Sequence, residues 1–130
     1  MFQGILPPQK HRAAVGQLLS SILLYMNTSL TAMEDISAAE STFLVELYTK
    51  VFTLEDVFVP FKAPEFVGAE WIKAQYVREI LEWRMVDIMD SWREGLLQGV
   101  FGPEEMAGWL RKLFQESDLR ARNISEIQHG

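Results

Sequence analysis

The chain has no cysteine, so disulfides, thiolate catalysis and cysteine-based zinc sites are excluded. Positive charge is also scarce, because 12 Lys and Arg residues stand against 18 Asp and Glu residues, for a net charge of −6. A deficit of cations argues against binding to nucleic-acid phosphates or to anionic lipid. We therefore expect no nucleic-acid partner, and a chain without cysteine fits a reducing compartment such as the cytoplasm.

Motifs for catalysis and metal binding are missing as well. The two histidines, His11 and His129, lie near the chain ends, and neither has the spacing of a metal ligand. No glycine-rich phosphate loop and no GxSxG nucleophile motif is present. Asp87 and Asp90 are three residues apart, but they lack the histidine partners of a di-iron site. We expect no catalytic, metal-binding or cofactor-binding residues; an enzyme or ligand-binding bundle would need Asp87, Asp90 and Arg84 around a cavity.

No charged residue occurs between positions 13 and 33. Apolar residues recur there at three- and four-residue spacing, which predicts an amphipathic helix. Seven residues of this stretch are Gln, Ser, Thr or Asn, mostly on the opposite face, which disfavours a membrane-spanning helix and direct membrane insertion. A helix face in water normally carries Lys or Glu. We therefore expect the uncharged face, which includes Leu24, to contact either other parts of a longer chain or a partner protein.

Glycine and proline are absent from residues 70–94, which predicts a single helix of about 37 Å. A helical projection gives two apolar sectors, which suggests neighbours on two sides of this helix. Trp92 lies in the main sector, while Ile72, Tyr76 and Trp83 form the second. Arg84 projects into the main apolar sector, so we expect it to be paired inside the protein with a carboxylate or with helix C-terminal carbonyls. The alternative is that its side chain extends to water.

Capping signals divide the rest of the chain. Ser37 and Glu40 have the spacing of a capping box, and Ser117 or Asp118 can cap a last short helix. Arg120 in that helix's first turn opposes the helix dipole, so a carboxylate or helix C-terminal carbonyls should receive it. The predicted fold is all-α, an antiparallel bundle of about five helices in one domain. The expected helices are residues 11–34, 38–57, 69–94, 103–116 and 118–127.

Four segments in order resemble the C-terminal region of the Zeste-white-ten family of Dsl-type tethering subunits. They are Asp35–Ser41, Leu54–Phe58, Phe66–Trp92 and Leu113–Arg120, the last containing Phe114, Ser117 and Arg120. Each motif alone has low specificity, whereas the ordered set covers nearly the whole chain. The resemblance implies the C-terminal domain of a longer helical rod with the CATCHR fold.

The resemblance also implies a function. The family forms a tether at the endoplasmic reticulum that captures COPI vesicles returning from the Golgi and engages SNAREs, and its C-terminal domain docks on an α-solenoid subunit. We therefore expect a non-enzymatic interaction domain that is cytoplasmic and peripheral on the endoplasmic reticulum membrane. The alternative is a kinetochore scaffold, because the same family joins Rod and Zwilch at animal kinetochores.

Two sets of residues are assigned roles. Trp and Arg are frequent interface anchors, which places the expected partner surface on the last two helices and on the uncharged helix. The expected partner-binding residues are Trp109, Arg111, Lys112, Arg122 and Leu24. The expected structural residues are Ser37, Glu40, Arg84, Trp92, Phe114, Ser117 and Arg120.

Overall fold

A computed structural model describes residues 8–130, and every regular element in this range is a helix. The predicted all-α fold class is therefore confirmed, although the chain divides into more helices than expected. The elements are α1 (Pro8–Ala32), α2 (Ala38–Phe52), the 3-10 helix η1 (Thr53–Phe58), α3 (Pro64–Val67), α4 (Ala69–Glu82), α5 (Met85–Arg93), α6 (Pro103–Leu113) and α7 (Asp118–His129).

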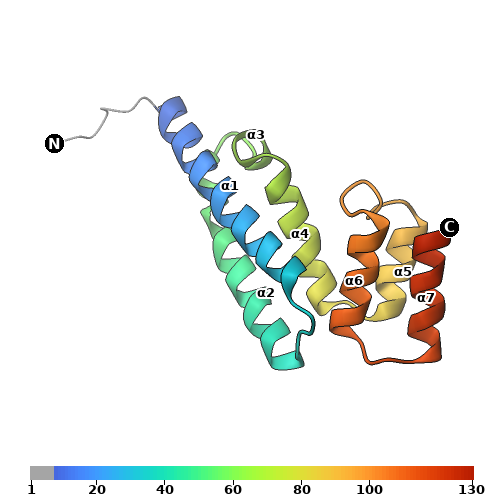
Figure 1. Ribbon diagram of the computed structural model, residues 1–130. Helices are drawn as coiled ribbons and strands as arrows, with labels where there is room; N and C mark the ends of the chain where they lie inside the picture. The colour runs from blue at the N-terminus through green and yellow to red at the C-terminus, as the bar shows by residue number, and fades with distance from the viewer. Residues whose placement is uncertain (1–7) are drawn as a thin grey trace.

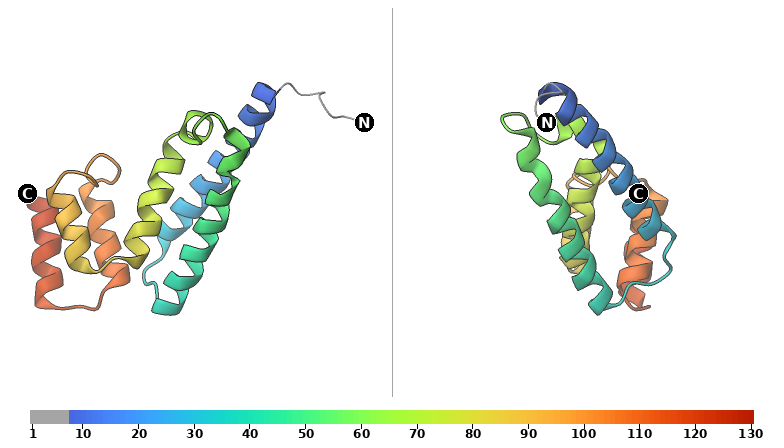
Figure 2. Two further views of the ribbon diagram at one scale, coloured as in Figure 1. Left: turned by 180° about the vertical axis from the view of Figure 1, so that it is seen from behind. Right: turned by 90° about the vertical axis from the view of Figure 1, so that its left-hand side faces the viewer.

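The helices gather into two units that lie side by side (Figure 1). In the N-terminal unit, residues 8–82, α1 and α2 run in opposite directions and both pack on α4, with α3 against the first half of α1. In the C-terminal unit, residues 85–130, α5, α6 and α7 stand together beside the end of α4, as the rear view in Figure 2 also shows. Buried apolar side chains of both units form one continuous core.

The expected continuous helix over residues 69–94 is wrong, because α4 ends at Glu82 and α5 begins at Met85. Trp83 and Arg84 are both extended, with ψ angles of 152° and 163°. No Gly or Pro causes this break. The break divides the main apolar sector read from the sequence: α4 buries Val77 and Ile80 in the N-terminal unit, whereas α5 buries Ile88 and Trp92 in the C-terminal unit. A break lets each half turn its own apolar face inward.

Local signals mark several helix ends. Ser37 Oγ accepts a hydrogen bond from the amide of Glu40 at 3.1 Å, and the Glu40 carboxylate accepts from the amide of Ser37 at 2.9 Å. This capping box starts α2. Gly95 has a φ of 87° just after the end of α5, a left-handed conformation that favours glycine. Pro103 stands at the first turn of α6, where its missing N–H costs nothing.

A buried polar network fixes the N-terminal unit. The Tyr48 hydroxyl on α2 donates to Asn27 Oδ1 on α1 at 2.7 Å, and Asn27 Nδ2 donates to Glu70 Oε1 on α4 at 3.1 Å. Tyr48 is fully buried, and burial raises the pKa of its phenol, with the nearby Glu70 charge adding to the effect. The network joins all three long helices of the unit. Buried polar groups need hydrogen-bond partners, and here each helix supplies the partner for a group on another.

The two units meet where α6 packs against the end of α1. The Lys112 ammonium on α6 donates to the carbonyl oxygens of Leu30 and Thr31 at 2.9 and 3.0 Å. Lys73 on α4 and Glu105 on α6 form an ion pair of 2.9 Å. In addition, the Ile36 amide donates to the Lys112 carbonyl oxygen at 2.8 Å. These contacts hold α6 against both α1 and α4.

A candidate interaction groove between the two helical units

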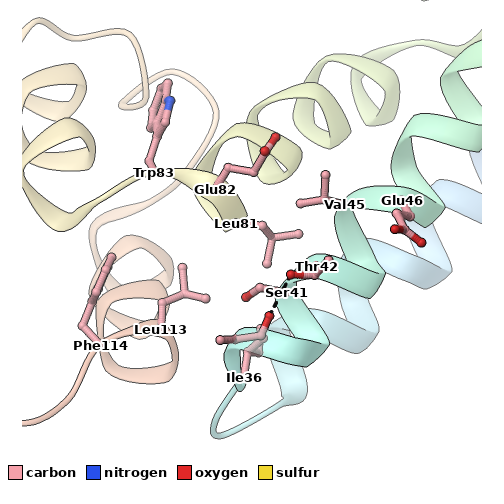
Figure 3. Close-up of a pocket in the computed structure, with 11 residues that line it drawn as sticks. Ile36, Ser41, Thr42, Val45, Glu46, Leu81, Glu82, Trp83, Leu113 and Phe114 are labelled. Atoms are coloured by element: carbon pink, nitrogen blue, oxygen red, sulfur yellow. Dashed lines mark hydrogen bonds between the residues drawn. The ribbon is translucent and has the colours of Figure 1, made fainter.

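An open groove runs between the units, with a volume of about 580 Å³ (Figure 3). One wall is the first half of α2, and the other consists of the ends of α4 and α6. We call it the inter-unit groove. It is lined by Ile36, Ala38, Ser41, Thr42, Val45, Glu46, Leu81, Glu82, Trp83, Leu113 and Phe114. Its size is in the range of sites that bind small molecules or several side chains of a partner.

Seven of the eleven lining residues are apolar, and three of these seven lie at helix ends. Trp83 lies in the extended break after α4, and Phe114 is the extended C-cap residue of α6. Leu113 precedes it as the last residue of α6. All three side chains are half-buried, so part of their apolar surface remains open to the groove. The helix breaks that separate the elements therefore also supply the groove's aromatic groups.

The groove is acidic at its rim. Among the eleven lining residues, Glu46 and Glu82 carry negative charge and none carries positive charge. Glu82 lies 3.6 Å from the Arg78 guanidinium, which is a loose pair. Glu46 is exposed and belongs to none of the ion pairs formed within residues 8–130. The arrangement favours cationic groups at the groove's edge.

A second open surface lies on α1. Leu18, Ile22 and Tyr25 follow one another at four- and three-residue spacing and are 61%, 40% and 75% exposed. We call these three residues the α1 stripe. No charged side chain accompanies them between residues 13 and 33. Leu24 is also exposed, on another side of α1. The stripe differs from the expected contact surface, because Leu18 and Ile22 belong to the recurring apolar residues of this helix and not to its uncharged polar face.

Two of the expected partner-binding residues are buried, so the prediction that they lie on the surface is wrong. Trp109 is 1% exposed and Lys112 is 6% exposed, so neither is accessible to another protein. The Lys112 ammonium lies 4.9 Å from the centre of the Trp109 ring. The same ammonium donates hydrogen bonds to the carbonyl oxygens at the end of α1. Burial lowers the pKa of Lys112, and the Glu105 charge partly opposes this effect. Both residues hold α6 in place.

The other expected partner-binding residues are exposed but dispersed. Arg111 on α6, Arg122 on α7 and Leu24 on α1 all face solvent. Leu24 belongs to the N-terminal unit and the two arginines to the C-terminal unit. Of the three, none lines the inter-unit groove. Their role in binding a partner stays a prediction.

Arg84 is not buried as expected. Its side chain is 81% exposed, and its Nε lies 3.3 Å from Asp87 Oδ2. The side-chain and backbone N–H groups of Arg84 both donate to Asp87, and these hydrogen bonds lower the pKa of that carboxyl. The helical projection failed because it assumed that residues 70–94 form one unbroken helix. At the start of α5, Arg84 points to water.

Arg120 occupies the corner between α6 and α7. Its NH1 donates to the carbonyl oxygens of Phe114 and Arg111 at 2.7 and 3.3 Å, which places positive charge at the C-terminal end of α6. Ser117 Oγ caps α7 by accepting from the Arg120 amide at 3.1 Å. Trp92 is buried in the core. Phe114 lies in the groove wall and is half-buried.

Two further features of the structure are not predicted by the sequence. Asn27 was assigned to the uncharged polar face, yet it is 3% exposed and central to the network with Tyr48. Thr42 and Val45 become lining residues only through the packing of the two units, which no local sequence pattern predicts. Within residues 8–130, no helix is both long enough and apolar enough to cross a membrane. In the same range, no three His, Asp or Glu side chains cluster so that they could hold a metal ion.

Comparison with known proteins places the chain in a family. The family described as the ZW10 C-terminal helical domain matches residues 1–127. The "Centromere/kinetochore protein zw10 homolog" of Rattus norvegicus is 27% identical over 145 residues. The "Centromere/kinetochore protein zw10" of Drosophila melanogaster is 25% identical over 131 residues.

The extent of these matches defines what the chain represents. Each covers 98% of this chain but only 18% of the relative, so the chain spans less than a fifth of the length of these proteins. No solved structure gave a significant match. The match to the family over nearly every residue agrees with the resemblance seen in the four ordered segments. The chain belongs to the ZW10 family and corresponds to its C-terminal helical domain.

Proposed function

We propose that this chain is a non-enzymatic interaction domain of a tethering-complex subunit that acts in Golgi-to-ER retrograde transport. The observation that carries the proposal is the match to the ZW10 C-terminal helical domain over residues 1–127. The role at the endoplasmic reticulum, with COPI vesicles and indirectly with SNAREs, comes from the family resemblance. The domain acts at the cytoplasmic face of that membrane through other proteins.

The expected partner is an α-solenoid subunit of the tether. Two exposed regions are available for it: the outer side of α6 and α7, with Arg111 and Arg122, and the uncharged side of α1, with Leu24. Exposed apolar groups at 3–4 spacing, as in the α1 stripe, are typical of surfaces that another protein covers. The dispersed positions of these residues favour a broad contact over a single pocket.

A second function, as a kinetochore scaffold, is supported by the names of the relatives. The rat and Drosophila proteins are both named as centromere or kinetochore proteins. The same helical domain serves either role if the partners differ. Imaging of a tagged full-length protein distinguishes the two, because a tether stays at the endoplasmic reticulum through mitosis and a kinetochore protein moves to chromosomes.

A pulldown with the purified α-solenoid subunit tests the proposed function. The intact chain is expected to bind, and the charge reversals Arg111→Glu and Arg122→Glu are expected to weaken binding. Lys50→Glu serves as a matched control, because Lys50 is an exposed cation on α2. The proposal fails if the intact chain does not bind. The assignment of the two arginines fails if binding is the same in all three variants.

A further inference from the structure

We propose that the inter-unit groove docks a short amphipathic helix of a partner protein, with apolar side chains facing the groove and Lys or Arg at its edges. The inference rests on the proposed function, since it names the chemistry of one partner of the interaction domain. The docked helix belongs to a different protein and not to this chain. Recognition of an amphipathic helix by an apolar groove is a common mode of protein binding.

The shape of the groove supports an inserted helix. Its apolar surface comes from two sides: Val45 belongs to α2, whereas Trp83 and Phe114 belong to the ends of α4 and α6. Figure 3 shows Thr42 and Val45 of α2 on one side of the open space and Leu113 and Phe114 at the end of α6 on the other. Half-buried aromatic groups at the junction of two rigid units are positioned to bury further area when a ligand binds. Side chains spaced at three and four residues can reach both walls from one helix.

Charge selects the class of ligand. Glu46 stands on the α2 wall and Glu82 on the α4 wall, with no cation among the other lining residues. Lys or Arg at the flanks of a docked helix would place positive charge near both carboxylates. The net charge of −6 adds a longer-range attraction for a cationic ligand. An acidic helix of the same shape would instead meet repulsion at both walls.

Charge also disfavours a second copy of this chain as the occupant. The exposed apolar groups that a copy offers at helical spacing are those of the α1 stripe, Leu18, Ile22 and Tyr25. Cations flank this stripe at one end only, at Lys10 and Arg12, and Glu34 and Asp35 follow its other end, so the stripe cannot supply cations on both sides. Two copies of a chain with net charge −6 also repel one another. A cationic segment from a different protein fits both walls better.

Fluorescence anisotropy with two peptides tests the inference. The probe is a labelled peptide of about 15 residues, a length at which isolated helices become marginally stable. It carries Leu at three- and four-residue spacing on one face and Lys at both ends, and its matched partner has Glu in place of every Lys. The intact chain is expected to bind the Lys peptide at least about tenfold more tightly than the Glu peptide.

Substitutions then locate the binding. Glu46→Lys is expected to weaken binding of the Lys peptide by about fivefold or more. Glu55→Lys changes the net charge equally, but Glu55 is exposed on η1 outside the groove, so its effect is expected to be below about twofold. Thr42→Trp fills the groove from an exposed position and is expected to abolish binding. Circular dichroism verifies that each variant keeps its helix content.

Each outcome decides the matter. Equal weakening by Glu46→Lys and Glu55→Lys, or unchanged binding to Thr42→Trp, shows that the peptide binds by overall charge and contradicts the inference. Equal affinity for the Lys and Glu peptides contradicts it too. A dimer in light scattering that is lost on Thr42→Trp shows that a second copy occupies the groove. Failure of the α-solenoid pulldown contradicts the proposed function alone, because the peptide titration does not use that subunit.

Discussion

The ammonium group of Lys112 donates a hydrogen bond to the carbonyl oxygen of Leu30 at 2.9 Å, across the boundary between the two helical units. A second bond goes to the Thr31 carbonyl at 3.0 Å. The last carbonyls of a helix have no partner within the helix and carry partial negative charge. Lys112 therefore caps α1 from α6, and the core of one unit completes the helix of the other.

Replacing Lys112 by Met should lower the free energy of unfolding by about 2 kcal/mol, because methionine keeps the aliphatic stem but leaves two carbonyls without their charged donor. Urea denaturation followed by circular dichroism measures the change. Lys50→Met is the control, since Lys50 is exposed near the end of α2, and it should shift stability by less than about 0.5 kcal/mol. Equal losses in the two variants would contradict the capping role.

The Tyr48–Asn27 contact predicts strong coupling between α1 and α2. Tyr48→Phe leaves the buried Asn27 amide oxygen without its donor, so the free energy of unfolding should fall by about 1–2 kcal/mol. Asn27→Ala should cost more, because it also removes the bond to Glu70. A double-mutant cycle is expected to give a coupling energy of about 1 kcal/mol. Strict additivity of the two substitutions would show that this hydrogen bond contributes nothing to stability.

The start of α5 offers a stabilising substitution. Arg84 occupies the N-cap position, where Ser or Asp is favoured and where an arginine side chain has no acceptor to offer. Arg84→Ser should raise the free energy of unfolding by about 0.5–1 kcal/mol, and Asp87 remains three residues later to complete a capping box. Thermal unfolding measures this as a higher Tm. Arg78→Ser, in the middle of α4, is the control and should lower Tm.

Acid should remove the contribution of the Arg93–Glu126 pair, which joins α5 to α7. Arg93 Nε and NH2 donate to the two carboxylate oxygens at 2.7 and 2.9 Å, and these bonds lower the pKa of Glu126. A lowered folded-state pKa gives stability that is present above the unfolded pKa, about 4.3, and is lost as pH falls through the folded value.

The measurement compares Glu126→Gln with the unsubstituted chain over pH. The Tm of the unsubstituted chain should be higher at neutral pH, and the difference should vanish well below the ordinary glutamate pKa. Both side chains are partly exposed, at 48% and 40%, so added salt should reduce the difference. A Tm difference that stays constant from neutral to acid pH would show that the pair does not account for it.

The helical fold class and several helix ends could be predicted from the sequence, because capping and turn residues act locally. The capping box is formed by Ser37 and Glu40 alone, and the left-handed turn at Gly95 depends only on the backbone of that glycine. The break at Trp83 and Arg84 could not be found in this way. No local signal marks it; it forms because α4 and α5 pack in different units. Long-range packing overrides the helical preference of those two residues.

The groove and the buried cation were missed for a related reason. Lys112 reads as a surface residue, since lysine is rarely buried without partners, and its partners are backbone carbonyls more than 80 positions away in the chain. Thr42 becomes a groove residue only because the end of α6 lies opposite. Tertiary arrangement creates both features. The resemblance of the ordered segments identified the family, but it predicted neither the groove nor the burial of Lys112.

The walls of the inter-unit groove belong to two bodies, and this gives the groove a thermodynamic consequence. Any ligand that contacts both Val45 and Phe114 stabilises the present spacing of the units in proportion to its binding free energy. Linkage makes the relation reciprocal. A substitution that loosens the hold of Lys112 on α1 should weaken ligand binding in the groove, although Lys112 does not line it.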